Sequence, residues 1–159
     1  MMTRIQFRAM PTDVARAYQS GQPDAYGHVP ERVVAEEGSG VPCRHCLDDV
    51  AAGEDYLILA YRPFSGLQPY AETGPIFLHA NACERRPDAS ETPRMFLRRP
   101  QMIVRGYSKD ERIVYGTGQV VATDRIAETA ASLLGRAEVD FVHVRSATNN
   151  CFQCRIDRF

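Results

Sequence analysis

The chain has no tryptophan and only one lysine, Lys109, among its 19 basic residues. It also has no long apolar run, since no stretch approaches the ~20 consecutive apolar residues that a membrane-spanning helix needs. Acidic and basic residues are nearly balanced, because 20 acidic and 19 basic residues give a formal net charge of -1. We therefore expect no general attraction to nucleic acid or to an anionic membrane.

The N-terminal segment Met1–Phe7 lacks the apolar run of a secretory signal. We therefore expect a cytoplasmic protein, in a reducing compartment where paired cysteines hold metal more often than they form disulfides. A chain of 159 residues predicts a single domain that spans residues 1–159. A domain of this size can bury a hydrophobic core without a metal, so any zinc would add to that core.

Short apolar segments bounded by glycine and proline predict strands that pair as hairpins. The expected pairs are Tyr56–Tyr61 with Ile76–His79, Met102–Tyr107 with Arg112–Tyr115, and Val139–Arg145 with Cys151–Asp157. Mixed hairpins and helices favour an α+β class over a doubly wound sheet. We predict one compact domain with a mainly antiparallel sheet and two or three helices, whose central strands include Tyr56–Tyr61 and Phe141–Arg145.

The clearest helix begins near Thr123 or Asp124 and ends at Gly135. Its apolar residues recur at the spacing of one helical face and are Ile126, Ala130, Leu133 and Leu134. This helix is expected to pack against the sheet. Shorter helices are expected after a cap at Thr12 or Asp13, and after Pro93.

The most specific chemical pattern is a pair of motifs with metal-ligand spacing. Cys43 and Cys46 form a C-x2-C motif, and His79 and Cys83 form an H-x3-C motif. Three thiolates and one imidazole suit a tetrahedral Zn²⁺ ion. We therefore predict that these four residues bind zinc, while His45 is a bystander beside the site.

Two other interpretations of the cysteines stay open. Buried free thiols are one, since cysteine is among the most buried residue types. A site made by both C-x2-C pairs, with Cys151 and Cys154 as the second pair, is the other. Residues three apart in a strand point to opposite faces, which disfavours the second pair as ligands of one ion. The turn after Pro42 can aim both its sulfurs inward, although it lacks the glycine of many zinc knuckles.

A different chemistry is suggested by His143 and Cys151, which flank the polar turn at residues 146–150. A thiolate beside an imidazole is the usual nucleophile pair, and Arg155 would border such a pocket. Nothing in the sequence marks an oxyanion site. We expect Arg145 nearly opposite Cys151, which leaves His143 within diagonal reach of the thiol for packing and hydrogen bonding.

Short segments spread along nearly the whole chain are shared with a known family. They are Phe7–Arg8, Pro42–Arg44, Leu47–Asp49, Gly53–Glu54, Leu57–Tyr61, Pro69–Tyr70, Gly74–Phe77, Arg105–Tyr107, His143–Ala147, Cys151 and Arg155–Arg158. By these segments the chain resembles a bacterial family called domain of unknown function 1203. The resemblance implies one compact α+β domain with no assigned activity, and it carries over no catalytic residue.

The resemblance also bears on the cysteines. It implies that counterparts of Cys43 and Cys151 are more widespread than those of Cys46, His79 and Cys83. Metal binding would then belong to one branch of the family, and Cys43, His143 and Cys151 would form the common cluster.

Two hypotheses from different classes follow. The first is a small cytoplasmic protein with a structural zinc site, acting as a binding or accessory module. The second is an enzyme of unknown reaction that uses Cys151 and His143. A structural site is closed by four protein ligands, whereas a working site keeps an open position or an accessible thiolate. The sequence indicates neither a substrate nor a partner.

Overall fold

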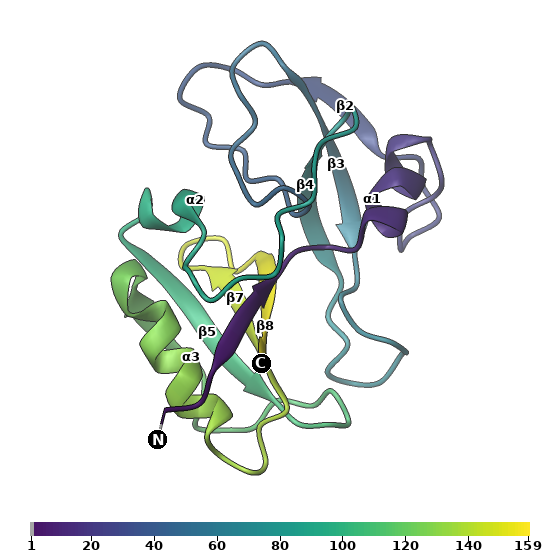
Figure 1. Cartoon of the computed structure of the whole chain (residues 1–159). Coiled ribbons are helices and arrows are strands. Elements are labelled where there is room, and N and C mark those ends of the chain that lie inside the picture. The colour runs from purple at the N-terminus through teal and green to yellow at the C-terminus, as the bar shows by residue number, and fades with distance from the viewer. Residues whose placement is uncertain (1) are drawn as a thin grey trace.

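Two antiparallel sheets carry the fold in the computed structural model, which describes residues 2–159 (Figure 1). The large sheet has the order β1 (Ile5–Arg8), β8 (Phe152–Arg158), β7 (Phe141–Ser146), β5 (Gln101–Tyr107) and β6 (Gln119–Ala122). The small sheet has the order β2 (Glu31–Val34), β3 (Asp55–Tyr61) and β4 (Gly74–His79). The helices are α1 (Thr12–Gln19), α2 (Arg94–Leu97) and α3 (Ile126–Leu134), and a 3-10 turn at Thr123–Arg125 precedes α3.

This architecture confirms the predicted α+β class, a mainly antiparallel fold with three helices among the described residues. One expectation was wrong, because β3 and β7 are each central in a sheet of their own. The burial of a strand predicts that it has neighbours on both sides. It does not identify them, because the same apolar pattern suits either sheet.

The large sheet buries one face beneath α3, which runs roughly alongside β5 in Figure 1. The four residues predicted for the apolar face of α3 are all buried: Ile126, Ala130, Leu133 and Leu134. They pack against β1, β5, β7 and β8 through side chains that include Phe7, Met102, Val144 and Ile156. In β7 the alternate residues Phe141, His143 and Arg145 therefore lie on the opposite face. That face is also covered, since all three are buried.

The predicted hairpin after Tyr107 forms only in part. Tyr107 pairs with Ile113 in a single bridge, and the chain then turns through Gly116, whose φ of 89° is left-handed. On this edge β5 pairs with β6, a strand that we did not predict, while β7 pairs with its other side. Three of the four β6 residues are exposed, so this edge strand lacks the alternation that predicts a half-buried strand.

The small sheet packs against α1 through a core of its own. This core contains Met10, Ala15, Ala35, Val41, Cys43, Val50, Leu57, Leu59, Ile76, Leu78 and Ala80. Its outer strand β2 is exposed at every position. Cys46 and Cys83 pack against the same core, so one predicted metal ligand, Cys43, lies within it and two lie at its border.

In the part of the chain that the structure describes, no helix has the length and apolar character needed to cross a membrane.

Candidate metal centre

The first two predicted ligands lie in a loop that closes on itself before β3. Its arms are joined by hydrogen bonds from Val50 N to Val41 O at 2.8 Å and from Cys43 N to Asp48 O at 3.0 Å. The turn between them is closed by Leu47, whose N–H donates to Cys43 O at 3.0 Å. Leu47 has a φ of 53°, the left-handed conformation that glycine adopts most easily. A leucine therefore takes a left-handed position that a glycine would adopt more easily.

The other two ligands come from the end of β4, against which this loop is fastened. Cys43 forms a parallel bridge with Phe77, and Arg44 N donates to Phe77 O at 3.2 Å. His79 ends β4, and Cys83 follows in the next segment. The loop with Cys43 and Cys46 precedes β3, and His79 and Cys83 lie at and after the end of β4. The pairing of β3 with β4 along their length therefore brings the two pairs of ligands together.

One face of helix α1 forms hydrogen bonds with the segment that carries His79 and Cys83. Arg16 donates to Cys83 O at 2.8 Å, and Gln19 Nε2 donates to His79 O at 2.9 Å. Thr12 lies one turn before Arg16 on the same face, and its hydroxyl is 2.9 Å from His45 Nε2. The expected side-chain cap is absent at α1, and the Thr12 hydroxyl is used at this site instead.

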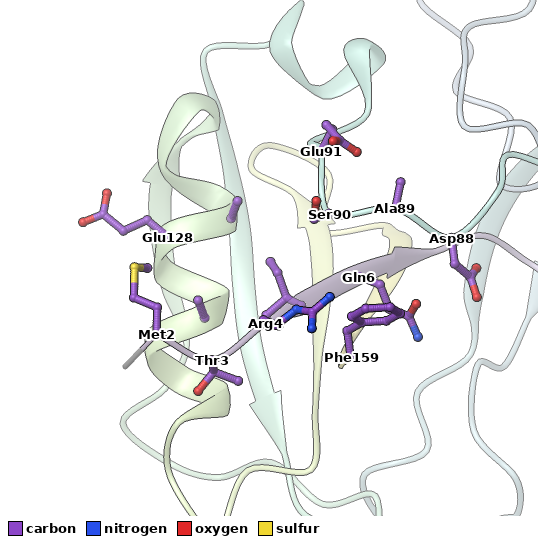
Figure 2. A pocket seen from close by; sticks show the side chains of 13 residues that line it. Met2, Thr3, Arg4, Gln6, Asp88, Ala89, Ser90, Glu91, Glu128 and Phe159 are labelled. Carbon is purple, nitrogen blue, oxygen red and sulfur yellow. The ribbon is translucent and has the colours of Figure 1, made fainter.

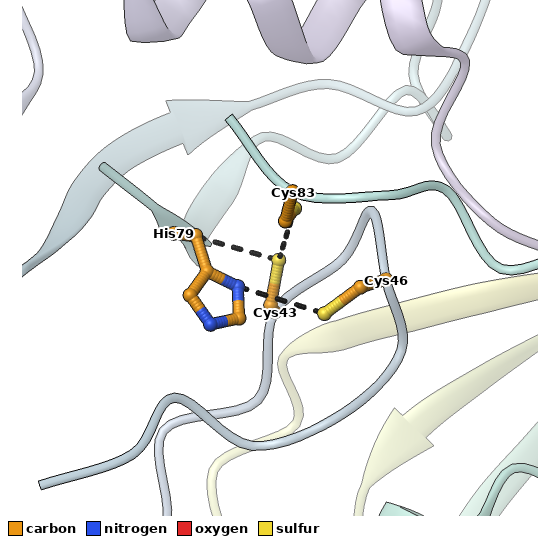
Figure 3. A group of neighbouring side chains, drawn as sticks. All are labelled: Cys43, Cys46, His79 and Cys83. Atoms are coloured by element: carbon orange, nitrogen blue, oxygen red, sulfur yellow. Dashed lines mark hydrogen bonds between the residues drawn. The ribbon is translucent and has the colours of Figure 1, made fainter. Parts of the chain in front are cut away.

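The four predicted ligands point toward one another (Figure 3). Their ligand atoms all lie within 4.8 Å of one another. Cys43 Sγ is 3.9 Å from Cys83 Sγ, and Cys46 Sγ is 3.5 Å from His79 Nδ1. A tetrahedral ion with ordinary zinc bond lengths would separate two sulfurs by about 3.8 Å, and a sulfur from a nitrogen by about 3.6 Å. The cluster could therefore hold a metal ion with little rearrangement.

The protonation of the cluster follows from its contacts. Hydrogen bonds from the Cys46 and Cys83 thiols lower the pKa of Cys43, and the same contact with Cys43 raises the pKa of Cys46. Contact with Cys43 and then Cys46 raises the pKa of His79 to about 10. Without an ion, these contacts favour a thiolate at Cys43 and a protonated ring at His79. A bound ion would replace these protons, because metal binding requires thiolates and a neutral imidazole.

Groups around the four side chains complete the site. His79 N–H donates to Cys43 Sγ at 3.4 Å, and a Glu54 carboxylate oxygen lies 3.9 Å from His79 Nε2. His45 Nδ1 lies 3.1 Å from Cys83 Sγ. His45 is fully buried and burial lowers its pKa, so the ring is neutral at neutral pH. Its other ring nitrogen, Nε2, lies 2.9 Å from the Thr12 hydroxyl, so the ring bridges Thr12 and Cys83 and His45 is a direct partner of a ligand.

The second cysteine pair lies outside this cluster. Cys154 is buried in the core beneath α3, where burial raises its pKa. Cys151 precedes β8 and is partly exposed, with its thiol 3.6 Å from Asn149 O. The two side chains thus have different surroundings, although Cys151 lies just before β8 and not within the predicted strand.

The structure places His143 and Cys151 on different cavities. A bulge in the β7–β8 pairing sets Arg145 opposite Phe152, and His143 opposite Arg155. The His143 ring packs on the Phe152 ring with centroids 4.7 Å apart. It borders the same cavity as Arg155, whereas Cys151 lines two others. Cys43 belongs to the core of the small sheet, apart from both. Use of the thiol–imidazole pair in catalysis stays a prediction.

The largest described cavity, about 670 Å³, lies between β1 and α3, and none of the cysteines lines it (Figure 2). Arg4 lies over the Phe159 ring at 4.5 Å from its centroid, and Glu128 and Glu91 stand at the rim. None of the predicted site residues lines this cavity.

Comparison with known proteins identifies a family. The family model described as protein of unknown function (DUF1203) matches residues 40–158, which include both metal-ligand motifs and all strands from β3 to β8. Comparison with curated proteins gives no match, and comparison with solved structures gives none either. The match covers most of the sequence, and the chain therefore belongs to the DUF1203 family.

Proposed function

We propose that Cys43, Cys46, His79 and Cys83 bind a structural zinc ion, and that the protein acts as a binding or accessory module. The observation that carries the metal site is the approach of three sulfurs and one imidazole nitrogen to within 4.8 Å of one another. Zinc is the ion that best suits a tetrahedral set of thiolate and imidazole ligands.

A structural role is supported by where the ligands come from. The ion would join the loop before β3 to the end of β4 and the segment after it. The small sheet has a core of eleven buried residues, three of them alanine, and an outer strand that is exposed throughout. Cross-linking by a metal contributes directly to folding in such small units. Four protein ligands would also leave no open position for a substrate, as is usual for structural zinc.

A cytoplasmic location agrees with this role, because thiolate ligands need a reducing compartment. We also propose that residues 1–159 fold as one unit. Arg44 supports this, since it extends from the metal loop and donates to Phe152 O in the large sheet at 2.7 Å.

The test is a metal analysis of protein produced without a histidine tag. We expect about one zinc per chain, and we expect Cys46→Ser and Cys83→Ser to lower this content several-fold. Cys151→Ser is the matched control, because it changes a partly exposed thiol outside the cluster. Removal of zinc by a chelator should speed amide hydrogen exchange in β3 and β4 more than in β7.

Protein that holds no stoichiometric zinc, and whose unfolding is the same in Cys46→Ser as in the parent chain, would show that the cluster is a set of buried thiols. Equal loss of zinc in Cys151→Ser and Cys46→Ser would show that the ion lies elsewhere.

A further inference from the structure

A second candidate site lies where the two sheets meet, away from the metal cluster. It is a cavity of about 460 Å³ between the connection from β1 to α1, the loop after β3, and the face of β7 and β8 turned away from α3. In Figure 1 this is the region where the chain passes from β1 to α1 beside the end of β3. The volume is within the range of small-molecule sites, about 300–1,000 Å³.

The walls of this cavity are rich in arginine. Arg8, Arg62, Arg85 and Arg155 line it, and Glu111 is the one carboxylate among the lining residues. Glu111 is already hydrogen-bonded to another lining residue, since its carboxylate accepts from Ser65 N at 3.0 Å and from Ser65 Oγ at 2.5 Å.

Three of the four guanidinium groups are held by two aspartates behind the wall. Arg155 pairs with Asp157 at 2.7 Å and Arg85 with Asp88 at 3.0 Å. Arg8 lies between these carboxylates, 3.3 Å from Asp157 and 3.4 Å from Asp88. These ion pairs fix the positions of the arginines and neutralise only part of their charge.

The fourth arginine has no such partner. Within residues 2–159, Arg62 enters no ion pair, and its buried Nε has no hydrogen-bond acceptor. This Nε is closed to solvent, so a ligand in the cavity would meet the terminal nitrogens of Arg62. They form no hydrogen bond among the described residues and are not buried.

The remaining wall is aromatic. Tyr61, Phe64 and Phe152 line the cavity, and His143 lies between the last two with ring centroids 5.3 and 4.7 Å away. His143 is 1% exposed, and its Nδ1 has no partner among the described residues. Burial and the nearby Arg145, Arg155 and Arg105 hold the pKa of His143 well below its usual value. The ring is therefore neutral at neutral pH and can offer one N–H without adding charge.

We propose that this cavity binds a small organic anion, a carboxylate or phosphate monoester, whose charged group pairs with Arg62 and Arg155 and whose apolar body lies against Tyr61, Phe64 and Phe152. Guanidinium groups recognise both kinds of oxyanion through paired hydrogen bonds. The aromatic wall selects an organic ligand over an inorganic ion. This inference rests on the proposed binding role and specifies the class of ligand for it. It does not depend on the zinc, because none of the four metal ligands lines the cavity.

The experiment measures binding of four probes to the full chain with its zinc retained. Benzoate and phenyl phosphate carry the two kinds of head group, benzamide is the neutral analogue of benzoate, and inorganic phosphate lacks the apolar body. We expect saturable binding of at least one aromatic anion, with an affinity at least about tenfold above those of benzamide and inorganic phosphate, because each of these two lacks either the charge or the apolar body. Chemical shift changes should concentrate at Tyr61, Phe64 and His143.

Arg62→Met keeps the side-chain stem and removes the charge, and it breaks no ion pair. We expect it to weaken binding of the aromatic anion about tenfold or more. Arg125→Met is the matched control, because it removes the same charge at an exposed position that lines none of the described cavities. We expect it to leave the affinity within about twofold.

Several results would overturn the proposal. They are the lack of saturable binding by both aromatic anions, equal binding of benzamide or of inorganic phosphate, and an unchanged affinity in Arg62→Met. Equal weakening in Arg62→Met and Arg125→Met would also overturn it, since the effect would then come from net charge alone. All of these outcomes leave the metal analysis unaffected, so failure here is distinguishable from failure of the zinc proposal.

Discussion

His45 Nδ1 lies 3.1 Å from the sulfur of Cys83, and its other ring nitrogen is held by Thr12 at 2.9 Å. His45, one of the two residues between the cysteines of the C-x2-C motif, thus faces Cys83, a ligand from the second motif. A hydrogen bond to a thiolate orients it and stabilises its charge, and partners of this kind tune metal affinity. His45 is therefore a positioning residue for the proposed site, where we expected a bystander.

Replacing His45 should weaken zinc binding without abolishing it. We expect His45→Phe to lower the zinc affinity about 10–100-fold, the usual cost of losing a partner of a metal ligand, while saturating zinc still fills one site. Competition with a chelator of known affinity measures the difference. His28→Phe is the control because His28 is exposed in an irregular segment. An affinity in His45→Phe equal to that of the parent chain would mean that the contact has no energetic role.

Arg44 should be a main link between the two sheets. It is 1% exposed, and it donates to Pro42 O at 2.7 Å in the metal loop and to Phe152 O at 2.7 Å in β8. Burial lowers its pKa to about 10, so it remains charged at neutral pH. Arg44→Met keeps the stem but leaves two buried carbonyl groups without this donor. We expect a loss of about 2–4 kcal/mol in the free energy of unfolding.

Urea unfolding, followed separately by signals from β3 and from β7, measures this loss. Arg98→Met is the control, since Arg98 forms its ion pairs at the surface and we expect a change below about 1 kcal/mol. If the two sheets already unfold independently in the parent chain, the proposal of a single folding unit is wrong.

Much of the fold could be predicted because its signals are local. The α3 face depends on four residues within three turns of one helix, and all four are buried. The pairing of β3 with β4 also appeared in the sequence as two apolar runs joined by a turn-rich loop. The division into two sheets could not be predicted, because it depends on which buried strands become neighbours. The exposed strand β6 gave no periodic signal.

The metal cluster could be predicted for a different reason. Ligand spacing of the C-x2-C and H-x3-C type restricts the geometry directly, and the four residues do converge. The surrounding groups gave a weaker signal. Thr12, Arg16 and Gln19 share one face of α1, which a helical projection would reveal, but nothing in the sequence indicates that this face meets Cys83 and His79. Contacts across 33 to 67 residues depend on the tertiary fold.

Gly106 in β5 should not tolerate a side chain. A Cβ added there would lie 3.2 Å from Thr117, which is fully buried and whose Oγ1 lies 2.9 Å from Gly106 N. We expect Gly106→Ala to destabilise the protein by about 1–3 kcal/mol, the usual cost of overpacking. At Gly118 the nearest atoms to an added Cβ are 3.8 Å away on Arg105, so Gly118→Ala is the matched control. Thermal unfolding compares them, and equal midpoints would contradict the prediction.

His143 should make the protein sensitive to acid. Its pKa is lowered well below 6.5 by burial and then by Arg145, Arg155 and Arg105. Well above pH 6.5 the ring is neutral in both folded and unfolded chains, and it contributes no pH dependence. Below 6.5 the unfolded chain takes up a proton that the folded chain refuses, so the free energy of unfolding falls until the pH reaches the folded-state pKa. The slope approaches about 1.4 kcal/mol per pH unit.

His143→Phe removes this linkage while keeping an aromatic ring among Phe64, Tyr107, Phe141 and Phe152. We expect the variant to lose about 1 kcal/mol less stability than the parent chain between about pH 7.5 and pH 5.5. Acid release of the proposed zinc affects both chains, so the difference between them isolates His143. Urea unfolding at the two pH values provides the measurement. Parallel losses in both chains would mean that His143 becomes protonated in the folded protein as readily as in the unfolded one.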